Sequence, residues 1–459
     1  MAFKEYKGLD LVAAGNEILD RWKKNRAFEK SLELREGAPE FIFFEGPPSA
    51  NGMPGIHHVM ARSIKDAICR YKTQSGYKVN RRAGWDTHGL PVELGVEKML
   101  GITKEDIGTK ITVEEYNDAC RKEVMKYTAE WVNMTERVGY WVDMNDPYIT
   151  YDNRYIETLW YLLKKIYDKG LLYKGKSIQP YSPAAGTGLS THELNQPGCY
   201  RDVKDTTAVA QFKVVRDEKS EFLYEQGVQP YFLAWTTTPW TLPSNTALCV
   251  GPNIDYVRVL STNPYTGEAG LYIVAQALVG AHFNPKKQEF TVLEGTLKGS
   301  ELTGISYEQL IPWFNPGEGA FKVIPGDYVT TEDGTGIVHI APTFGADDAK
   351  VARLAGVPGL QVVDRNGDLQ AQVDLRGRFF CIEDLDPEYA AANMSPEYAE
   401  WAGRYVKNAY DASLTDDAPT LDVDLCVMLK QQNKAFKIES IHITIHIAGV
   451  LTSRYSIIL

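Results

Sequence analysis

The sequence has few cysteines, no long apolar run and fewer basic than acidic residues. The six cysteines in 459 residues are widely separated and form no Cys-x-x-Cys pair, which gives no zinc site and favours reduced thiols in a cytoplasmic protein. No apolar segment approaches the roughly 18 residues that span a bilayer, and the first residues lack the apolar core of a signal peptide. We therefore expect a cytoplasmic protein without a membrane partner.

Acidic residues outnumber basic residues, 60 to 49. The net charge of -11 argues against a surface that binds phosphates generally. A local basic strip can still contact nucleic-acid phosphates on an acidic protein, and Lys72, Lys78, Arg81 and Arg82 form one such strip. Four charges at a solvated helix end are the commoner arrangement.

A length of 459 residues predicts two or three domains, and 44% hydrophobic residues predict that they are globular. The run Phe41-Ile42-Phe43-Phe44 predicts a buried parallel strand. Helical spacing of apolar residues then predicts a helix that ends near Gly76, and residues 77–80 predict the next strand. Residues 41–80 thus form a predicted βαβ unit.

Helical patterns follow at about residues 113–137 and 153–169. From about residue 200 to residue 385 the sequence becomes strand-like and is punctuated by Gly and Pro. This change predicts a mainly β insertion between two segments of an α/β domain.

A Gly/Pro-rich loop joins the first predicted strand to its helix. Ligands gather at the carboxyl ends of parallel strands, where helix N-termini offer free N–H groups to phosphates. Glycines allow a nucleotide to approach the backbone, and imidazoles can donate hydrogen bonds to a phosphate in the transition state. The alternative is a tight turn followed by a helix-capping His. The candidate residues of this loop are Gly46, Pro47, Asn51, Gly52, Gly55, His57 and His58.

A second polar segment, Gly84 to Glu93, follows the next strand. Its candidate binding residues are Trp85, Asp86 and His88. Asp86 has a structural alternative as the N-cap of the helix near Pro91, and Trp85 has one as an ordinary core residue.

The most distinctive segment runs from Trp235 to Asn245 and contains Thr236, Thr237, Thr238 and Trp240. Three consecutive hydroxyls beside Pro and Trp make a poor core but a good wall around a small polar substrate. The alternative is an ordinary strand rich in β-branched residues.

A partner segment lies about a hundred residues further on. It runs Gly334-Thr335-Gly336-Ile337-Val338-His339-Ile340-Ala341-Pro342 and is followed by Asp347-Asp348. Because its strand-like residues carry a His and precede a carboxylate, this segment could complete a pocket lined by the threonines.

These motifs resemble class I aminoacyl-tRNA synthetases. The threonine segment and its partner resemble the editing domain of isoleucyl-tRNA synthetases, since the valine and leucine enzymes typically have Thr-Thr-Arg-Pro-Glu/Asp there. Gly84 to Glu93 resembles the amino-acid-binding segment of the Ile, Val and Leu enzymes. Gly55 to His58 occupies the His-x-Gly-His signature, with His58 retained and Gly55 in place of the first His. His57 can substitute for that His if the loop shifts.

The resemblance implies an α/β fold: the first half of a Rossmann-like class I nucleotide-binding domain with a mainly β editing insertion. The implied domains are residues 1–198, the first half of the catalytic domain with connecting helices; 199–390, the editing insertion; 391–440, the segment that returns to the catalytic domain; and 441–459, a frameshifted tail.

The resemblance also implies roles for the residues of the first segments. ATP with Mg²⁺ and isoleucine would be substrates, with tRNA as the macromolecular partner and no protein-bound metal. Gly46, Pro47, Asn51, Gly52, Gly55 and His58 would line the adenylate pocket, and His57 and His58 would be catalytic. Pro47, Trp85, Asp86 and His88 would bind the amino acid, with Asp86 on its α-ammonium group.

In the editing site the implied chemistry is ester hydrolysis by a positioned water, without a covalent nucleophile. The threonine hydroxyls, with Thr237 as a catalytic candidate, would hold this water or the terminal ribose. His339 would contact the same sugar or limit side-chain size, and Asn245 would orient the loop or the ribose. Asp348 would bind the α-ammonium group, whereas Asp347 would be solvated.

The tail departs from the family. Ser440 should lead to a Tyr-Pro-His-Cys-Trp-Arg element, and permitted codons for residues 441–450 give that element when read one nucleotide earlier. We therefore interpret residues 441–459 as a frameshift product, so that His442 and His446 are not metal ligands. The second half of the nucleotide fold, a Lys-Met-Ser-Lys-Ser loop and an anticodon-binding domain are not in this sequence.

Three functions follow as hypotheses. The first is an isoleucine-tRNA ligase with hydrolytic editing of Val-tRNA, of which this chain is an incomplete fragment unable to aminoacylate. The second is a stand-alone aminoacyl-tRNA editing hydrolase. The third is a non-enzymatic remnant that binds tRNA.

Overall fold

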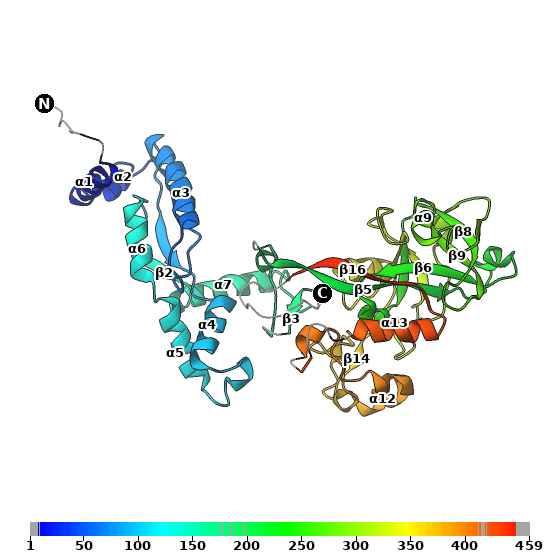
Figure 1. Cartoon of the computed structure of the whole chain (residues 1–459). Coiled ribbons are helices and arrows are strands. Elements are labelled where there is room, and N and C mark those ends of the chain that lie inside the picture. The colour runs from blue at the N-terminus through cyan, green and yellow to red at the C-terminus, as the bar shows by residue number, and fades with distance from the viewer. Residues whose placement is uncertain are drawn as a thin grey trace. The chain divides into compact units, whose positions relative to one another are not determined.

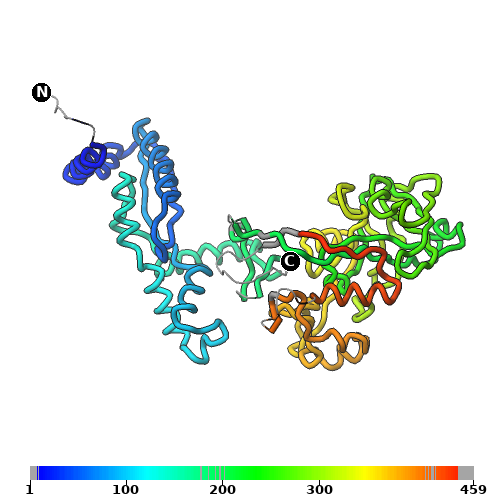
Figure 2. Tube along the Cα trace, viewed as in Figure 1, coloured from blue at the N-terminus to red at the C-terminus, as the bar shows by residue number. Residues whose placement is uncertain are grey.

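The structure is a computed structural model that describes residues 8, 10–175, 178–183, 186–195, 198–411, 413, 414, 418 and 420–446. The chain forms two compact units, Met1–Gly175 and Lys176–Leu459, which we call the first and second units. Figures 1 and 2 show both, with the first unit in blue to cyan and the second in green to red. Each unit is described by itself.

The first unit is mostly helical. Its elements are α1 (Leu11–Lys24), α2 (Ala27–Glu33), α3 (Ile56–Gln74), β1 (Arg82–Trp85), α4 (Leu90–Leu100), the 3₁₀ helix η1 (Lys104–Asp106), α5 (Val113–Val124), α6 (Thr128–Arg137), β2 (Asp143–Ile149) and α7 (Asn153–Asp168). Strands β1 and β2 pair in parallel.

The predicted βαβ unit is present in outline, because helix α3 connects two segments that approach each other in parallel. Their pairing is a single bridge between Glu40 and Lys78, and the next strand begins only at Arg82. The prediction of a buried strand at residues 41–44 is wrong, since Ile42 and Phe44 are 70% and 89% exposed. A buried parallel strand needs cover on both faces, which the first unit does not supply there.

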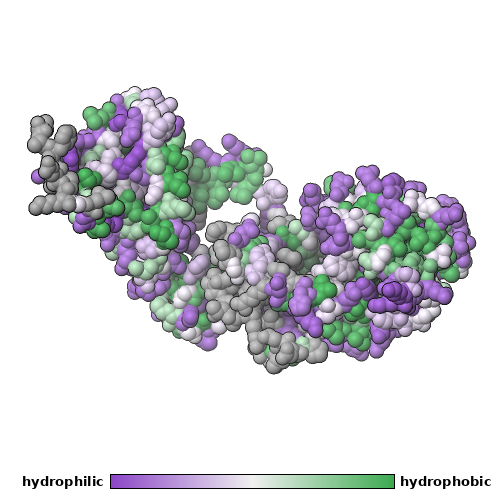
Figure 3. All heavy atoms as spheres, turned by 45° about the horizontal axis from the view of Figure 1, so that its top comes forward, coloured by the Kyte–Doolittle hydropathy of each residue, from purple (hydrophilic) through white to green (hydrophobic). Residues whose placement is uncertain are grey.

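The predicted helix at about 113–137 is two helices, α5 and α6. The break has a clear cause: the Tyr127 N–H donates to the carbonyl of Ala50, 3.0 Å away, instead of continuing the α5 hydrogen-bond pattern. This bond ties the helix pair to the Gly/Pro-rich loop. Helix α7 agrees with the second predicted helix, and it exposes large hydrophobic side chains, among them Trp160 and Tyr161. Figure 3 colours residues of high hydropathy, such as leucine and isoleucine, green.

The second unit is mainly β, as predicted for residues 200–385. Its strands are β3 (Tyr181–Ser182), β4 (Thr187–Gly188), β5 (Tyr200–Lys213), β6 (Pro230–Thr236), β7 (Ala247–Val250), β8 (Asp255–Thr262), β9 (Ala269–Ala275), β10 (Phe290–Val292), β11 (Leu297–Lys298), β12 (Lys322–Pro325), β13 (Ile337–Ile340), β14 (Val362–Val363), β15 (Leu369–Gln370) and β16 (Ala435–His446).

Short helices connect these strands. They are α8 (Thr191–Leu194), η2 (Glu221–Tyr224), η3 (Pro239–Ser244), η4 (Gln276–Leu278), α9 (Val279–His282), α10 (Gly299–Leu302), α11 (Ala346–Leu354), η5 (Ile382–Asp384), α12 (Pro387–Asn393), η6 (Pro396–Glu400), η7 (Asn408–Tyr410) and α13 (Leu421–Gln431).

One ten-stranded mixed sheet organises the second unit, in the order β10-β8-β9-β6-β13-β7-β12, with β11 on β8, β5 on β6 and β16 on β5. Strand β13 lies between β6, with which it is parallel, and β7, with which it is antiparallel. All four residues of β7 are buried, as expected for a strand covered on both faces. The large core of the unit forms around these strands.

Strand β16, which lies after residue 390, belongs to the same sheet. Strand β16 pairs with β5 from Ala435–Ala210 to His446–Tyr200, so the first residues of the predicted frameshifted tail are in a strand. The alternating Ile-His-Ile-Thr pattern suits a strand whatever its origin. Residues 447–459 lie outside the described residues. Within the part of the chain that the structure describes, no helix has the length and apolar character needed to cross a membrane.

Candidate functional site

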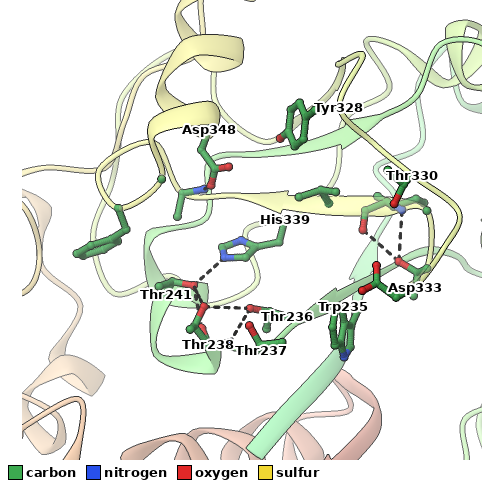
Figure 4. A pocket seen from close by; sticks show the side chains of 18 of the residues that line it. Trp235, Thr236, Thr237, Thr238, Thr241, Tyr328, Thr330, Asp333, His339 and Asp348 are labelled. Atoms are coloured by element: carbon green, nitrogen blue, oxygen red, sulfur yellow. Dashed lines mark hydrogen bonds between the residues drawn. The ribbon is translucent and has the colours of Figure 1, made fainter. Parts of the chain in front are cut away.

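A cavity of about 340 Å³ in the second unit contains most of the residues predicted for the editing site (Figure 4). It is bounded by the end of β6, by η3, by β13 and by the start of α11. Its lining residues are Trp235, Thr236, Thr237, Thr238, Trp240, Thr241, Tyr328, Thr330, Asp333, Gly334, Thr335, Gly336, Ile337, Val338, His339, Ala341, Phe344, Gly345 and Asp348.

Strand pairing explains why segments a hundred residues apart meet here. Trp235 of β6 lies opposite Val338 of β13, so the threonines that follow Trp235 lie near His339. The turn before β13 requires glycine at Gly336, which has φ of 73° and where an added Cβ would lie 2.4 Å from the Cβ of Ala275. The pairing of strands in the sheet therefore brings the threonine segment and the His339 segment together.

The threonines end β6 and start η3. The hydroxyl of Thr236 accepts a hydrogen bond from the Thr238 N–H at 3.1 Å, which turns the chain out of the strand. The Thr238 hydroxyl lies 3.4 Å from those of both Thr236 and Thr241. Figure 4 shows these side chains grouped below His339. Among the described residues no hydrogen bond to the Thr237 hydroxyl is found, which leaves this hydroxyl for a bound molecule.

His339 is 8% exposed, and hydrogen bonds engage both nitrogens of its ring. Nε2 lies 2.9 Å from the hydroxyl of Thr241, and Nδ1 lies 3.0 Å from the side-chain nitrogen of Asn245. Burial lowers the pKa of His339 to about 4. The imidazole is therefore neutral at pH 7, and neither of its nitrogens is free to take a proton from water.

Asn245 is the one residue of the predicted editing set that does not line the cavity. It lies directly behind His339, is 2% exposed and accepts a hydrogen bond from the Tyr307 hydroxyl at 2.7 Å. Asn245 thus supports the wall of the cavity from behind.

Asp348 lies in the first turn of α11, where the helix dipole favours a negative charge. Its Oδ2 accepts a hydrogen bond from the Ala341 N–H at 2.8 Å. Burial raises the pKa of the Asp348 carboxyl, and this hydrogen bond acts in the opposite direction. A Cβ on Gly345 would lie 2.7 Å from the Asp348 carboxyl carbon, so glycine makes room for this side chain. Asp347, its neighbour, is exposed.

In the first unit, the Gly/Pro-rich loop contacts the second predicted segment through a hydrogen bond of 2.9 Å from the Asp86 N–H to the Pro48 carbonyl. Above Gly46 and Gly52 there is open space, with no atom within 4 Å of an added Cβ. The Trp131 ring nitrogen donates to the Gly52 carbonyl at 2.8 Å and so fixes the loop. Pro47 and Asn51 are half-buried beside it.

His58 caps helix α3, as the structural alternative for this loop anticipated. Its Nδ1 accepts a hydrogen bond from the Gly55 N–H at 2.9 Å, and its ring lies 4.5 Å from that of Trp131. Burial, followed by the positive charges of His57 and Arg62, lowers the pKa of His58. His57 is exposed, with its ring centre 3.8 Å from that of His58.

The second predicted segment, Gly84 to Glu93, contains one buried candidate residue and two exposed ones. Trp85 is 4% exposed and packs in the core, which matches its structural alternative. Asp86 is exposed and is not the N-cap of α4, which is Gly89. His88 is exposed, with Nδ1 3.0 Å from the Thr150 hydroxyl. Among the described residues, no group of three or more His, Cys, Asp or Glu side chains could hold a metal.

The basic strip expected at the end of α3 is largely neutralised. Arg81 is buried and donates to the Thr73 hydroxyl at 2.8 Å, while Lys78 and Arg82 form ion pairs with Glu36 and Asp146. These pairs leave less positive charge for a nucleic acid than the sequence predicts.

The family model for class I tRNA synthetases (I, L, M and V) matches residues 17–348. The chain belongs to this family. The synthetase motifs of both units lie within the matched range, which confirms the resemblance to class I synthetases and the α/β fold with a mainly β editing insertion.

The synthetase chain is similar to three curated isoleucine–tRNA ligases. It is 63% identical to that of Bacteroides fragilis over 451 residues, which are 95% of this chain and 39% of that protein. It is 63% identical to the Porphyromonas gingivalis protein over 95% of this chain and 40% of that one, and 52% identical to the Cytophaga hutchinsonii protein over 96% and 40%. The chain thus spans about 39% of the length of the first of these relatives.

Two solved structures are distantly similar to this synthetase chain. The crystal structure of GlLeuRS-CP1 covers 51% of this chain and 99% of its own, at 17% identity and a TM-score of 0.33. The editing domain of the Plasmodium falciparum cytosolic leucyl-tRNA synthetase covers 35% and 75%, at 11% identity and a TM-score of 0.27. Structural similarity at these TM-scores gives no evidence about function.

Sequence reasoning missed three residues that hold the synthetase cavity together. Thr241 bonds to His339, and Tyr307 bonds to Asn245. Asp422 of α13 is fully buried and accepts a hydrogen bond from the Trp240 N–H at 2.7 Å. Its other oxygen pairs with Lys407 at 2.5 Å, and Lys407 pairs with Asp205 at 2.6 Å. Thr241 lies inside the recognised motif, whereas Tyr307 and Asp422 belong to no motif.

Proposed function

We propose that the second unit is an editing site that hydrolyses the aminoacyl ester of mischarged tRNA, and specifically valine attached to the isoleucine tRNA. One observation carries this proposal: a cavity of about 340 Å³ brings a wall of threonine hydroxyls together with a half-buried carboxylate. That combination suits a substrate with a ribose ester at one end and an α-ammonium group at the other.

The chemistry fits hydrolysis by a positioned water. Among the described residues that line the cavity there is no serine or cysteine to act as nucleophile. His339 is poorly suited to be the general base, because burial lowers its pKa to about 4 and both ring nitrogens are engaged in hydrogen bonds. Catalysis would then rest on orientation and on hydrogen bonds to the developing negative charge, with the hydroxyl of Thr237 as a candidate donor.

Asp348 would recognise the cation of the substrate. The α-ammonium group is common to all aminoacyl esters, so this contact binds the substrate without selecting the amino acid. Selection would come from the walls, where His339 and its neighbours limit the space for the side chain. A cavity that admits valine and excludes isoleucine then separates the wrong ester from the right one by size.

A second site of this kind is needed on energetic grounds. One methylene distinguishes isoleucine from valine and is worth only about 1–3 kcal/mol in an apolar pocket, a range for which the isoleucine enzymes are themselves the standard example. A smaller hydrolytic chamber multiplies this discrimination, because it acts on the product that the first site fails to reject.

We further propose that the whole protein is an isoleucine–tRNA ligase, on the strength of 63% identity to the Bacteroides fragilis protein of that name over 95% of this chain. Its substrates would be isoleucine, ATP with Mg²⁺ and the isoleucine tRNA in the cytoplasm. In this chain the open loop at Gly46 and Gly52 and the N-terminus of α3 fit a nucleotide phosphate. Asp86, exposed beside this loop, would bind the amino acid.

Two assays test these proposals. Hydrolysis of Val-tRNA by the purified chain is expected, and its absence under conditions where the chain is folded would rule out the editing proposal and leave the tRNA-binding alternative. Isoleucine-dependent ATP–pyrophosphate exchange reports the ligase reaction. Val-tRNA hydrolysis without exchange in the complete protein would favour the stand-alone hydrolase.

A further inference from the structure

Backbone carbonyls anchor the loop of Gly334–Gly336 to the elements behind it. The Thr335 carbonyl accepts a hydrogen bond from the Ala275 N–H at 3.0 Å, and the Gly336 carbonyl accepts one from the Tyr256 hydroxyl at 2.5 Å. These donors lie on β9 and β8, and none of the described residues that line the cavity belongs to either strand. The loop therefore turns these two carbonyls away from the cavity.

The Gly334 carbonyl is anchored by a side chain instead. It lies 2.7 Å from Nε2 of His282, the last residue of α9. A carbonyl oxygen only accepts hydrogen bonds, so Nε2 of His282 carries a proton and donates. Burial lowers the pKa of His282, and the hydrogen bond to Gly334 acts in the opposite direction. Because the ring is neutral at pH 7, its Nδ1 is unprotonated, and this atom is buried without a partner among the described residues.

The geometry of the peptide bond sets the direction of the N–H groups in the loop. In a planar trans peptide the N–H points opposite to the carbonyl that shares its plane. The N–H of Thr335 thus points away from His282, and that of Gly336 points away from Ala275. Among the described residues no hydrogen bond from either N–H is found. Both residues line the cavity, so two backbone donors are available to a molecule bound there.

The loop lies at the far end of the cavity from Asp348. Strand β13, of four residues, separates the loop from Ala341, whose N–H holds the Asp348 carboxylate. At roughly 3.3 Å per residue this strand spans about 13 Å. Figure 4 shows Asp348 at one end of the cavity and Asp333 with Trp235 at the other. A substrate with its α-ammonium group on Asp348 would extend its nucleoside towards the loop.

Charge indicates which kind of group the loop accepts. None of the described residues that line the cavity is a lysine or an arginine, and Asp333 directly precedes the loop. A phosphate would meet this carboxylate without a compensating cation. The N–H groups of Thr335 and Gly336 are therefore suited to a neutral acceptor, such as a nitrogen or oxygen atom of the terminal nucleoside.

One peptide of the loop depends on a single donor. Gly334 has φ of 67°, and an added Cβ would lie 3.1 Å from the Trp235 ring, so the loop requires glycine here. Glycine also lets the peptide that follows it rotate at little steric cost. Among the described residues, His282 is the only hydrogen-bond donor found for the Gly334 carbonyl. Without it the Gly334–Thr335 peptide can turn, which would take the Thr335 N–H away from the cavity.

We propose that His282 is a positioning residue for the editing reaction, because its hydrogen bond to Gly334 keeps the Thr335 N–H directed towards the terminal nucleoside of the substrate. The kinetic part of this inference rests on the function proposed above. The hydrogen bond of His282 itself does not depend on that function.

The first experiment reads the hydrogen bond of His282 directly. In the full chain with ¹⁵N-labelled histidine, two-bond ¹H–¹⁵N spectra at pH 7 should show His282 with its proton on Nε2, the signal being assigned by its loss in His282→Gln. A proton on Nδ1 would leave the Gly334 carbonyl without a donor and would overturn the proposal.

The second experiment measures the role of this hydrogen bond in hydrolysis. His282→Phe keeps a planar ring but removes the donor, and it should raise KM for Val-tRNA roughly tenfold, the loss expected for one hydrogen bond. The value of kcat should change little, because Asp348 and the reacting end of the substrate are not affected. His282→Gln places an amide N–H near the position of Nε2 and should restore the wild-type KM.

Tyr398→Phe is the matched control. Tyr398 also donates to a backbone carbonyl, that of Phe380, at 2.7 Å, and it does not line the cavity, so this variant should keep the wild-type KM. His282→Asn, whose amide is too short to reach Gly334, covers the case in which His282→Phe does not fold, and it should raise KM to a similar extent. A wild-type KM in folded His282→Phe or His282→Asn would contradict the positioning role.

The salt dependence of KM identifies the acceptor. The ratio of KM between His282→Phe and wild type should be equal at low and high salt, because the lost contact is with a neutral group. A ratio that falls towards one at high salt would show that the loop holds a phosphate, and would overturn the neutral acceptor. Wild-type chain that hydrolyses no Val-tRNA would instead defeat the proposed function, and the spectra would still decide the hydrogen bond of His282.

Discussion

At the scale of single residues, the cavity depends on groups whose charge is set by burial. Asp348 is a carboxylate held by the Ala341 N–H and by the N-terminus of α11, although burial raises its pKa. His339 is the opposite case, an imidazole that burial keeps neutral. A negatively charged Asp348 beside a neutral ring suits an ammonium group, and Asp333 adds a second carboxylate to the lining of the cavity.

Asp348→Asn should reduce Val-tRNA hydrolysis roughly 100-fold, which corresponds to about 2.7 kcal/mol in the transition state. The amide keeps the shape of the side chain but removes the charge that attracts the α-ammonium group. Asp347→Asn is the matched control, because Asp347 is the exposed neighbour on the same helix turn. The measurement is single-turnover deacylation; similar losses in both variants would exclude a specific role for Asp348.

The pKa of His339 predicts a pH dependence of stability. Between its folded value of about 4 and its ordinary value of 6.5, the unfolded chain binds a proton that the folded chain does not. The free energy of unfolding should therefore fall as the pH is lowered from 6.5 towards 4, by up to about 3 kcal/mol from this residue. The raised pKa of Asp348 gives the free energy of unfolding a pH dependence of the opposite sign. This contribution is present both in wild type and in the variant His339→Gln, which is used for the test.

Urea unfolding of wild type and His339→Gln across this pH range measures the effect. The variant lacks the imidazole, so the difference between the two curves isolates His339. Parallel curves would show that His339 titrates in the folded chain near its ordinary pKa, and a general-base role would be open again.

At the scale of elements, part of the site can be predicted from sequence. Thr236 and His339 belong to strand-like segments with unusual polar residues, and a shared pocket follows from a known family pattern. The parallel pairing of β6 with β13 supplies the geometry. The strand predicted at residues 41–44 was wrong because apolar composition predicts burial only where another layer covers the strand.

The role of Asp422 could not be predicted from the sequence. It is one of two aspartates in α13, and nothing local distinguishes it from Asp424, which forms a half-exposed pair with Arg404. Only the fold puts Asp422 against the Trp240 N–H and Lys407. Burial raises the pKa of Asp422 to about 6, and the ion pair with Lys407 opposes that shift.

Asp422→Ala should destabilise the second unit by about 3 kcal/mol, because it removes one partner of a buried ion pair and leaves the Trp240 N–H unsatisfied. Asp424→Ala, on the same helix, should cost less than about 1 kcal/mol. Chemical unfolding followed by tryptophan fluorescence measures both. Equal stability of the two variants would mean that the buried pair does not hold η3.

At the scale of the whole molecule, the second compact unit extends beyond the predicted insertion of residues 199–390. It includes α13 and β16, and it begins at Lys176. These later elements belong to the unit because β16 pairs with β5, and because Lys407 and Asp422 support the threonine loop. Sequence patterns predicted the insertion but not its pairing with β16, because the pairing of strands far apart in the sequence leaves no local signal.

A fragment of residues 176–446 should fold and retain Val-tRNA hydrolysis, whereas a fragment of residues 199–390 should not fold. The shorter fragment lacks the strand that pairs with β5, and it lacks Lys407 and Asp422, two of the three residues of the buried ion network, while keeping the third, Asp205. Circular dichroism and thermal melting of the two fragments check this. A cooperative melt of residues 199–390 would contradict the account.

The frameshift prediction also belongs to this scale. If residues 441–459 come from a shifted frame, the coding DNA must read Tyr-Pro-His-Cys-Trp-Arg one nucleotide earlier. Sequencing the gene decides the matter, and codons incompatible with that element would end the hypothesis. The strand pairing of residues 441–446 does not bear on it, since any alternating sequence of this kind can extend β16.

The central claim is that the cavity beside His339 accepts valine and excludes isoleucine. The most direct test is the rate at which the chain deacylates Val-tRNA and Ile-tRNA made from the same isoleucine tRNA. We predict that Val-tRNA is hydrolysed at least 100-fold faster, and that Thr237→Ala slows this reaction. Equal rates for the two esters would contradict a size-selective chamber.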